Sequence, residues 1–427
     1  MNYIQNEKIM SITERTLVIG IDIAKKVQYA RAFDYRGIEL GKVRSFENTA
    51  EGFRMFEDWA KSLANQKQKN NIVVGMEPTG HYWFNLGHFL KDLGVKLVLV
   101  NPFHVKRSKE LDDNSQTKND IKDPKTIAKL VIEGRYFEPY IPEGIYSELR
   151  VAMDMREGLG KNLSKIKNKV TQWLDKYFPE FNDVFADWEG KAALITLKEF
   201  PTPEKVLSTG VQQIILEWRK EVKRAVGNQR AVRLIEAAKI SIGIKEGLRM
   251  AEKDLIVNLE QYDLYSRQLD LLELEIEELA LQIPGAKEII TIKGVGIITA
   301  AGFIAEVGDI KRFTHPSQIQ KLAGLNLIEN SSGKHKGKTS ISKRGRSRLR
   351  ALLFRVMMPL VAKNPEFKML HEHYKNRKDN PLKKKQSLIL LCCKLIRILF
   401  TIMTKQVEYN PQKLILDISN LQLKEAV

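Results

Sequence analysis

Residues 16–140 contain strand-like and helix-like segments in an order that few folds accept. Three apolar, β-branched runs come first and are joined by short turns: TLVIGIDIA, VQYARAFD and GIELGKVRSF. A helix beginning near Thr49 follows, and then a strand NIVVGME, a helix HYWFNLGHFLKDLG and a strand VKLVLVNP. A meander of three strands followed by two helix–strand crossovers is the order expected of a ribonuclease-H-like sheet. A doubly wound nucleotide-binding domain would instead need helices between its first strands and a glycine-rich first turn.

Acidic residues stand in this region at points where a structural carboxylate is unexpected. Asp22 lies in the middle of the first strand, and Glu77 ends the fourth. Asp120 and Asp123 follow in the segment KNDIKDPK. A buried carboxylate is costly unless a positive group compensates it, and a divalent metal is the usual compensation. Four carboxylates converging from separate elements would form a magnesium site for phosphodiester chemistry.

Each of these carboxylates also has an explanation without a metal. Asp22 could face solvent or a nearby lysine, and Glu77 could serve a turn before a proline. Asp123 precedes Pro124 and fits the N-cap of a helix DPKTIAKLVIEG at least as well as it fits a metal site. Asp120 is expected to lie outside that helix, where it could still face the same ion as Asp123. The neighbouring Asp112 and Asp113 lie in a polar segment that we expect to be a loop.

Residues 141–283 show no strand alternation and are expected to be helical. A heptad repeat of mostly apolar residues runs through the second half of this region. Its two seams are Leu248, Leu255, Tyr262, Leu269, Ile276 and Ile283, and Ala251, Asn258, Tyr265, Leu272 and Leu279. Such a repeat indicates a coiled coil, in which the polar Asn258 would fix the register. A coiled coil would imply self-association, whereas the alternative is a long helix packed on its own domain.

Pro284 and Gly285 end the heptad region. The segment that follows, IPGAKEIITIKGVGIITAAGFIAEVG, predicts a helix, a Gly-Val-Gly turn and a second helix. A helix-hairpin-helix uses such a turn to direct backbone N–H groups at a phosphate, and an ordinary tight turn explains the pattern equally well. The expected fold class is α/β plus α. It comprises a ribonuclease-H-like domain (1–140), a helical and coiled-coil middle (141–283) and a mostly helical C-terminal domain (284–427).

The positive charge of the chain is concentrated in one stretch. The 427 residues carry a formal net charge of +18, and residues 331–400 hold 19 Lys/Arg against 3 Asp/Glu. Charge of this density implies a polyanionic partner, either nucleic acid or an anionic membrane. The apolar run Leu388–Met403 is interrupted by two cations and is too short to span a bilayer, so we expect a buried helix and no membrane partner. The N-terminus lacks a signal-peptide core and the only cysteines are adjacent in that run, which favours a reduced, cytoplasmic protein.

A basic loop at residues 331–350 is the second candidate site. It contains eight Lys/Arg, no acid, and glycines that let the backbone approach a phosphate. We expect nucleic acid to be bound by Lys334, Lys336, Lys338, Lys343, Arg344, Arg346 and Arg348. The loop begins with Ser331 and Ser332, and a serine hydroxyl among cations can act as a nucleophile toward a phosphodiester. The alternative is a flexible basic loop that binds nucleic acid without chemistry.

Several motifs, in this order, resemble the DEDD transposases of bacterial insertion sequences (insertion-sequence family 110), also described as bridge-RNA-guided serine recombinases. GIDIAKK, GMEPTGHYW and KNDIKDPKTIAKL are similar to the RuvC-like N-terminal domain of that family. KYFPEFNDVF and LKEFPTPEKVL resemble its helical middle. ITIKGVGIITAAGFIAEVGDIKRF, KLAGLNLIENSSGKHKG and SKRGRSRLRALL resemble its C-terminal transposase domain. The resemblance therefore covers nearly the whole chain.

The resemblance implies a role for each candidate residue. The acidic tetrad of the family, which holds Mg²⁺, falls on Asp22, Glu77, Asp120 and Asp123, and its catalytic serine falls on Ser332, with Ser331 as the neighbouring alternative. The family exchanges DNA strands through a phosphoserine intermediate, while a structured guide RNA pairs with donor and target DNA, so base pairing supplies the specificity. The serine and the carboxylates lie about 200 residues apart. A homo-oligomer, either a dimer or a tetramer, would let a second subunit complete the site.

Two other functions fit part of the pattern. A RuvC-like, metal-dependent junction nuclease would use the carboxylates and leave the serine without a role. A non-catalytic nucleic-acid-binding protein would use the basic region alone. The second alternative gives no reason for Asp22 to stand in the middle of a strand.

Overall fold

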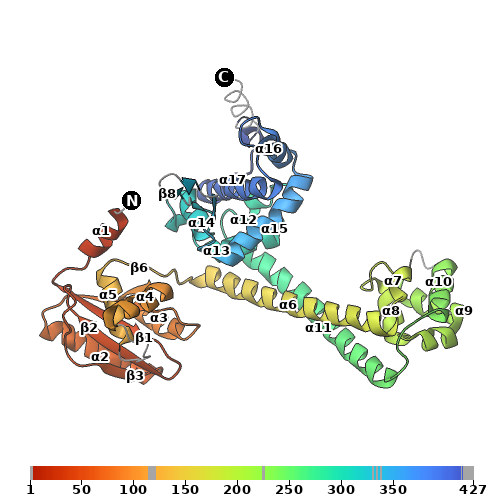
Figure 1. Ribbon diagram of the computed structural model, residues 1–427, viewed down its shortest axis with the longest axis horizontal. Helices are drawn as coiled ribbons and strands as arrows, with labels where there is room; N and C mark the ends of the chain where they lie inside the picture. The colour runs from red at the N-terminus through yellow and green to blue at the C-terminus, as the bar shows by residue number, and fades with distance from the viewer. Residues whose placement is uncertain are drawn as a thin grey trace. The chain divides into compact units, whose positions relative to one another are not determined.

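The computed structural model describes residues 3–113, 122–223, 227–328, 331–332, 335–336, 339–414 and 416 (Figure 1). The chain divides into two compact units, Met1–Ile141 and Pro142–Val427. The first is built around a mixed sheet covered by helices, and the described part of the second is almost entirely helical. The chain is therefore a mixed α/β protein followed by an α-helical unit.

The N-terminal unit contains one sheet of six strands in the order β3-β2-β1-β4-β5-β6. The strands are β1 (Thr16–Asp22), β2 (Val27–Phe33), β3 (Arg44–Glu47), β4 (Asn71–Met76), β5 (Lys96–Val100) and β6 (Tyr136–Phe137). The first three pair antiparallel, β1, β4 and β5 are parallel, and β6 returns antiparallel to β5. The predicted meander and both crossovers are confirmed. The two-residue β6 was not predicted, because so short a strand leaves no alternating pattern.

Helices cover both faces of this sheet. They are α1 (Tyr3–Met10), α2 (Ala50–Gln66), α3 (Trp83–Asp92), α4 (Pro102–Asp113) and α5 (Asp123–Ile132). The apolar faces of α2 and α3 pack on one side of the sheet, and α4 and α5 pack on the other. The expectation of a loop around Asp112 and Asp113 is wrong, because α4 continues to Asp113.

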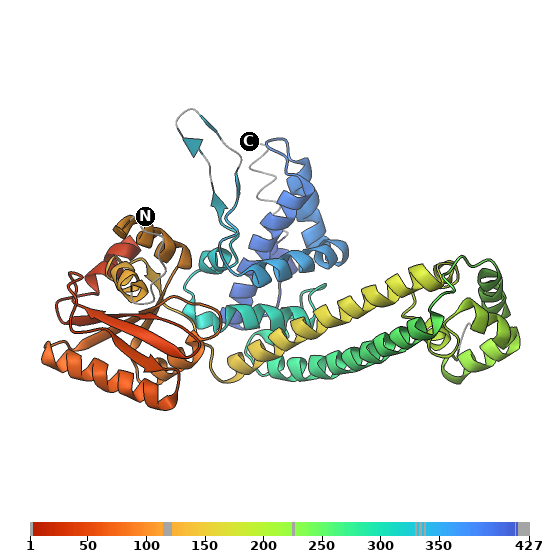
Figure 2. The same ribbon diagram turned by 60° about the horizontal axis from the view of Figure 1, so that its bottom comes forward.

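Two helices of equal length, α6 (Gly144–Tyr177) and α11 (Leu248–Leu281), run side by side in the C-terminal unit (Figure 2). The end of α6 and the start of α11 share one core with the short helices between them. Those helices are α7 (Phe181–Val184), α8 (Lys191–Glu199), α9 (Pro203–Glu221) and α10 (Asn228–Lys239). The start of α6 and the end of α11 belong to a second core, so the pair is antiparallel.

The heptad repeat of α11 is satisfied within the chain. Leu255 and Ile276 are fully buried in cores to which α6 contributes. Asn258 is 2% exposed, and its Nδ2 donates to the main-chain oxygen of Asp254 at 2.7 Å. A long helix packed on its own unit therefore describes this segment. The repeat is accounted for without a partner helix from a second copy, and the inference of self-association from it is withdrawn.

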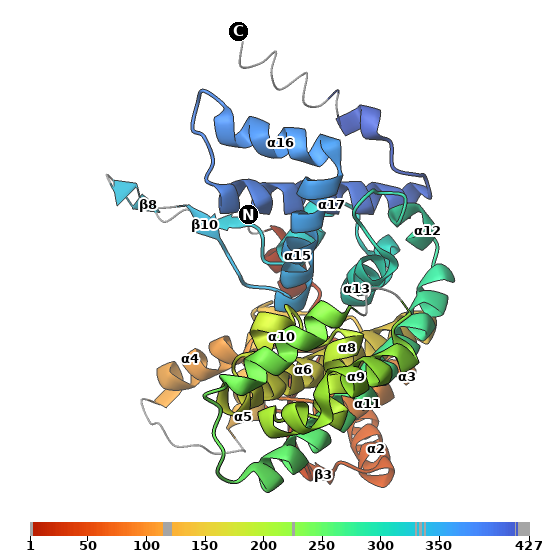
Figure 3. The same cartoon turned by 90° about the vertical axis from the view of Figure 1, so that its right-hand side faces the viewer.

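The second core is formed by the remaining helices (Figure 3). They are α12 (Ala286–Ile289), α13 (Ile297–Val307), the 3-10 helix η1 (Ile310–Arg312), α14 (Pro316–Leu322), α15 (Ser347–Lys363), α16 (Pro365–Asn376) and α17 (Lys384–Lys405). The predicted helix, Gly-Val-Gly turn and helix correspond to α12 and α13. Among the described helices, α17 alone has the length and composition to cross a membrane, but about half of its apolar stretch is buried in this core.

The basic segment forms two short antiparallel ladders in the described residues. β7 (Leu327–Ile328) pairs with β10 (Ser340–Ile341), and β8 (Ser331–Ser332) pairs with β9 (His335–Lys336). The expectation of a loop throughout residues 331–350 is therefore wrong at Ser331–Ser332, His335–Lys336 and Ser340–Ile341, which are short strands.

Candidate active site

The expectation that Asp22 lies in the middle of its strand is wrong, because β1 ends at Asp22. Glu77 directly follows β4, so the two acids lie at the carboxyl ends of adjacent parallel strands. The register of β1 and β4 pairs Gly20 with Gly75, and each acidic residue follows its glycine by two positions. Side chains alternate between the faces of a strand, so each acid shares the face of its glycine. The intervening residues of β1 and β4 pack against α2 and α3. Asp22 and Glu77 are therefore directed to the opposite face, on which α5 lies.

Two glycines allow α5 to lie directly on this face. A Cβ atom on Gly20 would stand 1.9 Å from the main-chain oxygen of Pro124. A Cβ atom on Gly75 would stand 2.5 Å from Cγ2 of Val131. No larger residue fits at Gly20 without moving the backbone of α5. Asp123 directly precedes Pro124, so this close packing fixes the start of α5 near the ends of β1 and β4.

Glu77 and Asp123 lie within electrostatic range of each other and of Lys109. Burial raises the pKa of Glu77 above its ordinary value of 4.5; the Lys109 ammonium lowers the pKa and the Asp123 carboxylate raises it. Asp123 also forms an ion pair with Lys109 of α4. Lys109 thus compensates part of the negative charge at this site, a role that nothing in the sequence around it indicated.

The helix-cap explanation of Asp123 is wrong. α5 begins at Asp123 itself, its cap position is Lys122, and no side-chain cap hydrogen bond is present. Asp123 is instead the first helical residue, with Pro124 directly after it. Its carboxylate therefore makes no cap hydrogen bond and is instead paired with Lys109.

A buried glutamine holds the turn that follows Asp22. Gln28 of β2 is fully buried, and its Oε1 accepts from the main-chain N–H of Ala24 at 2.7 Å. Its Nε2 donates to the main-chain oxygen of Ala24 at 2.9 Å. Both polar atoms of the amide are satisfied by one residue, which fixes the backbone two positions beyond Asp22.

The donor set suits a divalent cation. Carboxylate oxygens are the ligands that Mg²⁺ prefers, and a half-buried Glu77 beside a second carboxylate is the situation that such an ion relieves. In the part of the chain that the structure describes, no three acidic, histidine or cysteine side chains lie close enough to hold a metal as they stand. Asp120, the remaining predicted ligand, lies outside the described residues.

The predicted serine lies in the other compact unit, on β8. Ser332 pairs with His335 of β9 in the ladder, and Ser331 pairs with Lys336. Only the backbone of these four residues is described. Lys334 and Lys338 lie outside the described residues.

Two of the predicted nucleic-acid-binding arginines have partners within the chain. Arg346 donates to the main-chain oxygen of Glu306 at 2.7 Å. Arg348 forms ion pairs with Asp154 and, at 2.8 Å, with Glu157 of α6. These contacts hold the start of α15 against α13 and α6. Lys343 and Arg344 are exposed.

Comparison with known proteins defines the class of enzyme to which this chain belongs. Residues 19–179 match a family model described as a transposase, of the DEDD type, and residues 286–372 match the model of the transposase IS116/IS110/IS902 family. The two ranges together span more than half of the chain. The protein is therefore a transposase, an enzyme that transfers DNA. It belongs to the IS110/IS116 family of insertion-sequence transposases.

Relatives along most of the chain agree with this assignment. The insertion element IS116 uncharacterized 44.8 kDa protein of Streptomyces clavuligerus is 22% identical over 404 residues, covering 94% of this chain and 98% of that protein. The transposase for insertion sequence element IS1111A of Coxiella burnetii is 23% identical over 372 residues, covering 85% of this chain and 80% of that protein. The similarity thus extends over both compact units.

Proposed function

We propose that this transposase exchanges DNA strands through a phosphoserine intermediate formed at Ser332, with Mg²⁺ held by Asp22, Glu77, Asp120 and Asp123. The register of β1 and β4 supports the proposed metal site, because it brings two acids to the carboxyl ends of these strands, beneath the start of α5. The strand order of the N-terminal unit is the one expected of a ribonuclease-H-like, RuvC-like fold, which we assign to it.

The proposed chemistry is a reversible exchange of phosphodiester bonds. The Ser332 hydroxyl loses its proton and its oxygen bonds to phosphorus, while the bond from phosphorus to one DNA oxygen breaks and that oxygen takes up a proton. Attack by the hydroxyl of a new strand then releases the serine. Asp22, Glu77 and Asp123 would hold the ion, which when bound stabilises negative charge on the phosphate oxygens. Cations of the basic segment, Lys343 and Arg344 among them, would hold the DNA backbone.

The partners that we propose follow from the same assignment. Donor and target DNA are the substrates, and a structured guide RNA supplies sequence specificity by base pairing. The serine and the carboxylates belong to different compact units. We therefore propose assembly into a dimer or tetramer, in which a second copy completes the site. The proposed location is the cytoplasm, where the DNA is.

Replacing Ser332 with alanine is expected to abolish a covalent protein–DNA adduct. Denaturing electrophoresis of wild-type protein incubated with labelled donor DNA should show a species that protease removes, because a phosphoserine bond survives denaturation. The matched variant Ser331→Ala should retain it. An adduct that persists in Ser332→Ala and vanishes in Ser331→Ala would move the nucleophile by one residue.

A metal-dependent junction nuclease is the second candidate, and the carboxylate cluster alone favours it. Hydrolysis releases free DNA ends, whereas serine exchange leaves ends linked to protein. Magnesium-dependent cleavage that yields only free ends in the same experiment would support the nuclease. Absence of any cleavage would favour a non-catalytic binding protein.

The free energy of unfolding is expected to depend on pH through Glu77. Because its folded-state pKa is raised, the folded chain binds more protons than the unfolded chain, and stability falls as pH rises from 4.5 through the raised pKa. Glu77→Gln removes this titration and should be more stable than wild type at neutral pH. Urea unfolding in EDTA at about pH 4.5 and about pH 7.5 measures the effect. If the free energies of unfolding of the variant and the wild type differ by the same amount at both pH values, the raised pKa of Glu77 is contradicted.

A further inference from the structure

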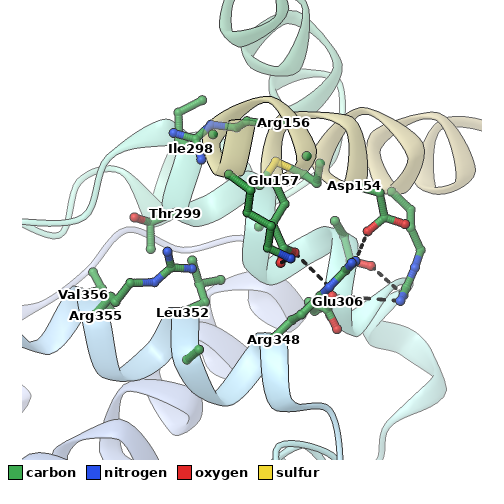
Figure 4. Close-up of a pocket in the computed structure, with 18 of the residues that line it drawn as sticks. Asp154, Arg156, Glu157, Ile298, Thr299, Glu306, Arg348, Leu352, Arg355 and Val356 are labelled. Carbon is green, nitrogen blue, oxygen red and sulfur yellow. Dashed lines mark hydrogen bonds and ion pairs between the residues drawn. The ribbon is translucent and has the colours of Figure 1, made fainter. Parts of the chain in front are cut away.

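A charged groove lies in the C-terminal unit between α6, α13 and α15 (Figure 4). Its volume is about 920 Å³. The six cations that line it are Arg150, Arg156, Lys161, Lys165, Arg348 and Arg355. Three carboxylates, Asp154, Glu157 and Glu306, also line it, so the lining has an excess of three positive charges. We call this cavity the arm groove.

The carboxylates of the arm groove are already paired with cations. Arg348 bridges Asp154 and Glu157, and Lys161 lies 2.6 Å from Glu157. Arg150 and Arg346 both approach Glu306. These pairs neutralise the negative charge of the lining and hold its three helices together. Arg156 is paired with Glu273 of α11, which does not line the groove, at 2.6 Å, so two of the six cations remain without such a pair.

Two cations of the arm groove have no ion-pair partner among the described residues. They are Lys165 on α6 and Arg355 on α15, and both are exposed. In Figure 4 the Arg355 guanidinium points across the groove toward Thr299 of α13. Glu157 attracts Arg355 without a contact ion pair, and a guanidinium can bind a phosphate through two donors at once.

The start of α13 adds backbone donors to the same wall. Gly294, Ile298 and Thr299 line the groove. α13 has 11 residues, and its cap residue Gly296 supplies no side-chain hydrogen bond. The N–H groups of Thr299 and Ala300 already donate to the main-chain oxygen of Gly296, at 3.0 and 3.1 Å, so the donors that this helix start can offer an anion are the N–H groups before Thr299.

The length of the arm groove fits an extended polyanion. Its α6 wall runs from Arg150 to Lys165, which at 1.5 Å per residue is about 22 Å. A nucleic-acid duplex rises about 3.4 Å per base pair along its axis, so this wall is as long as roughly six base pairs. We propose that the arm groove binds the sugar-phosphate backbone of a nucleic acid, with Lys165, Arg355 and the start of α13 as its phosphate ligands. The proposal rests on the family's action on DNA and is independent of the serine and the metal.

Salt-dependent binding tests the proposal. The double variant Lys165→Gln/Arg355→Gln is compared with Lys169→Gln/Lys368→Gln, which removes two exposed charges outside the groove. Fluorescence anisotropy in EDTA follows labelled duplex DNA, single-stranded DNA and single-stranded RNA between about 50 and 200 mM salt. The groove variant should lower the slope of log K against log salt by about 2, and the control should leave it unchanged.

The probe with the largest loss of slope identifies the strand that occupies the arm groove. Slopes equal to those of the control with all three probes would overturn the proposal. Thr299→Glu is a second variant. An acid at the third position of α13 favours the helix, so weaker binding by this variant would not result from loss of folding. It should keep or raise the melting temperature and still weaken binding. Unchanged binding by this variant would also overturn the proposal. Neither result depends on whether Ser332 forms an adduct.

Discussion

Asp22→Asn is expected to abolish DNA strand exchange while leaving nucleic-acid binding nearly intact. The substitution keeps the shape of the side chain and removes its charge at the point where β1 ends beside Glu77. Loss of a group that only supports a metal ligand costs about 10- to 100-fold in activity, so loss of a ligand should exceed 100-fold. Recombination between a donor and a target plasmid measures the first effect, and anisotropy with labelled DNA measures the second.

Asp58→Asn is the matched control, because Asp58 is exposed on α2, on the side of the sheet opposite α5. It should exchange strands at the wild-type rate. Metal binding has a readout of its own: Mg²⁺ at 100 times its dissociation constant should stabilise wild-type protein by about 2.7 kcal/mol, and Asp22→Asn should lose this gain. A fall in DNA binding equal to the fall in activity would contradict the metal role of Asp22.

The sheet was predictable because its strands carry their own signal. β-branched runs at the positions of β1, β4 and β5 predict buried parallel strands, and the short turns around β2 predict the meander. The sequence did not indicate α4, whose polar composition resembles that of a loop. The heptad repeat of α11 was visible in the sequence, but the helix that packs against it was not, because α6 lies 71 residues or more earlier in the chain.

The site was predictable only in part, because its residues carry local signals but their contacts come from segments distant in sequence. Asp22 and Glu77 are conspicuous because each is a carboxylate on an apolar strand. The local pattern of Asp123 before a proline suggested a cap, whereas the ion pair that Asp123 forms comes from Lys109, on another helix. The partners of Arg346 and Arg348 are likewise distant in sequence. The sequence does carry one local signal for the position of α5. Gly-x-Asp at the end of β1 and Gly-x-Glu at the end of β4 place a glycine where α5 packs directly on the sheet.

Gly20→Ala is expected to destabilise the N-terminal unit severely and to abolish its response to Mg²⁺. The new Cβ would lie 1.9 Å from the oxygen of Pro124 and 2.9 Å from the nitrogen of Ala128, both backbone atoms of α5. No side-chain rotation relieves such a contact, so α5 must move away and carry Asp123 with it. We expect a loss at the upper end of overpacking effects, about 3 kcal/mol, or roughly 10 °C in melting temperature. Calorimetry with and without Mg²⁺ measures both effects.

Gly75→Ala is a matched comparison, because Gly75 pairs with Gly20 across the two strands and faces the same helix. Its close contacts would be with side-chain atoms, Cγ2 of Val131 at 2.5 Å and Cγ2 of Ile127 at 3.2 Å, and the backbone oxygen of Ile19 would lie at an ordinary 3.8 Å. Side chains can yield, so the loss should be smaller, about 1 kcal/mol. Adding Val131→Ala to Gly75→Ala should relieve the clash and cost less than the two separate changes together, whereas it should not rescue Gly20→Ala. Equal losses for the two glycines would mean that close backbone packing at Gly20 does not set the position of Asp123.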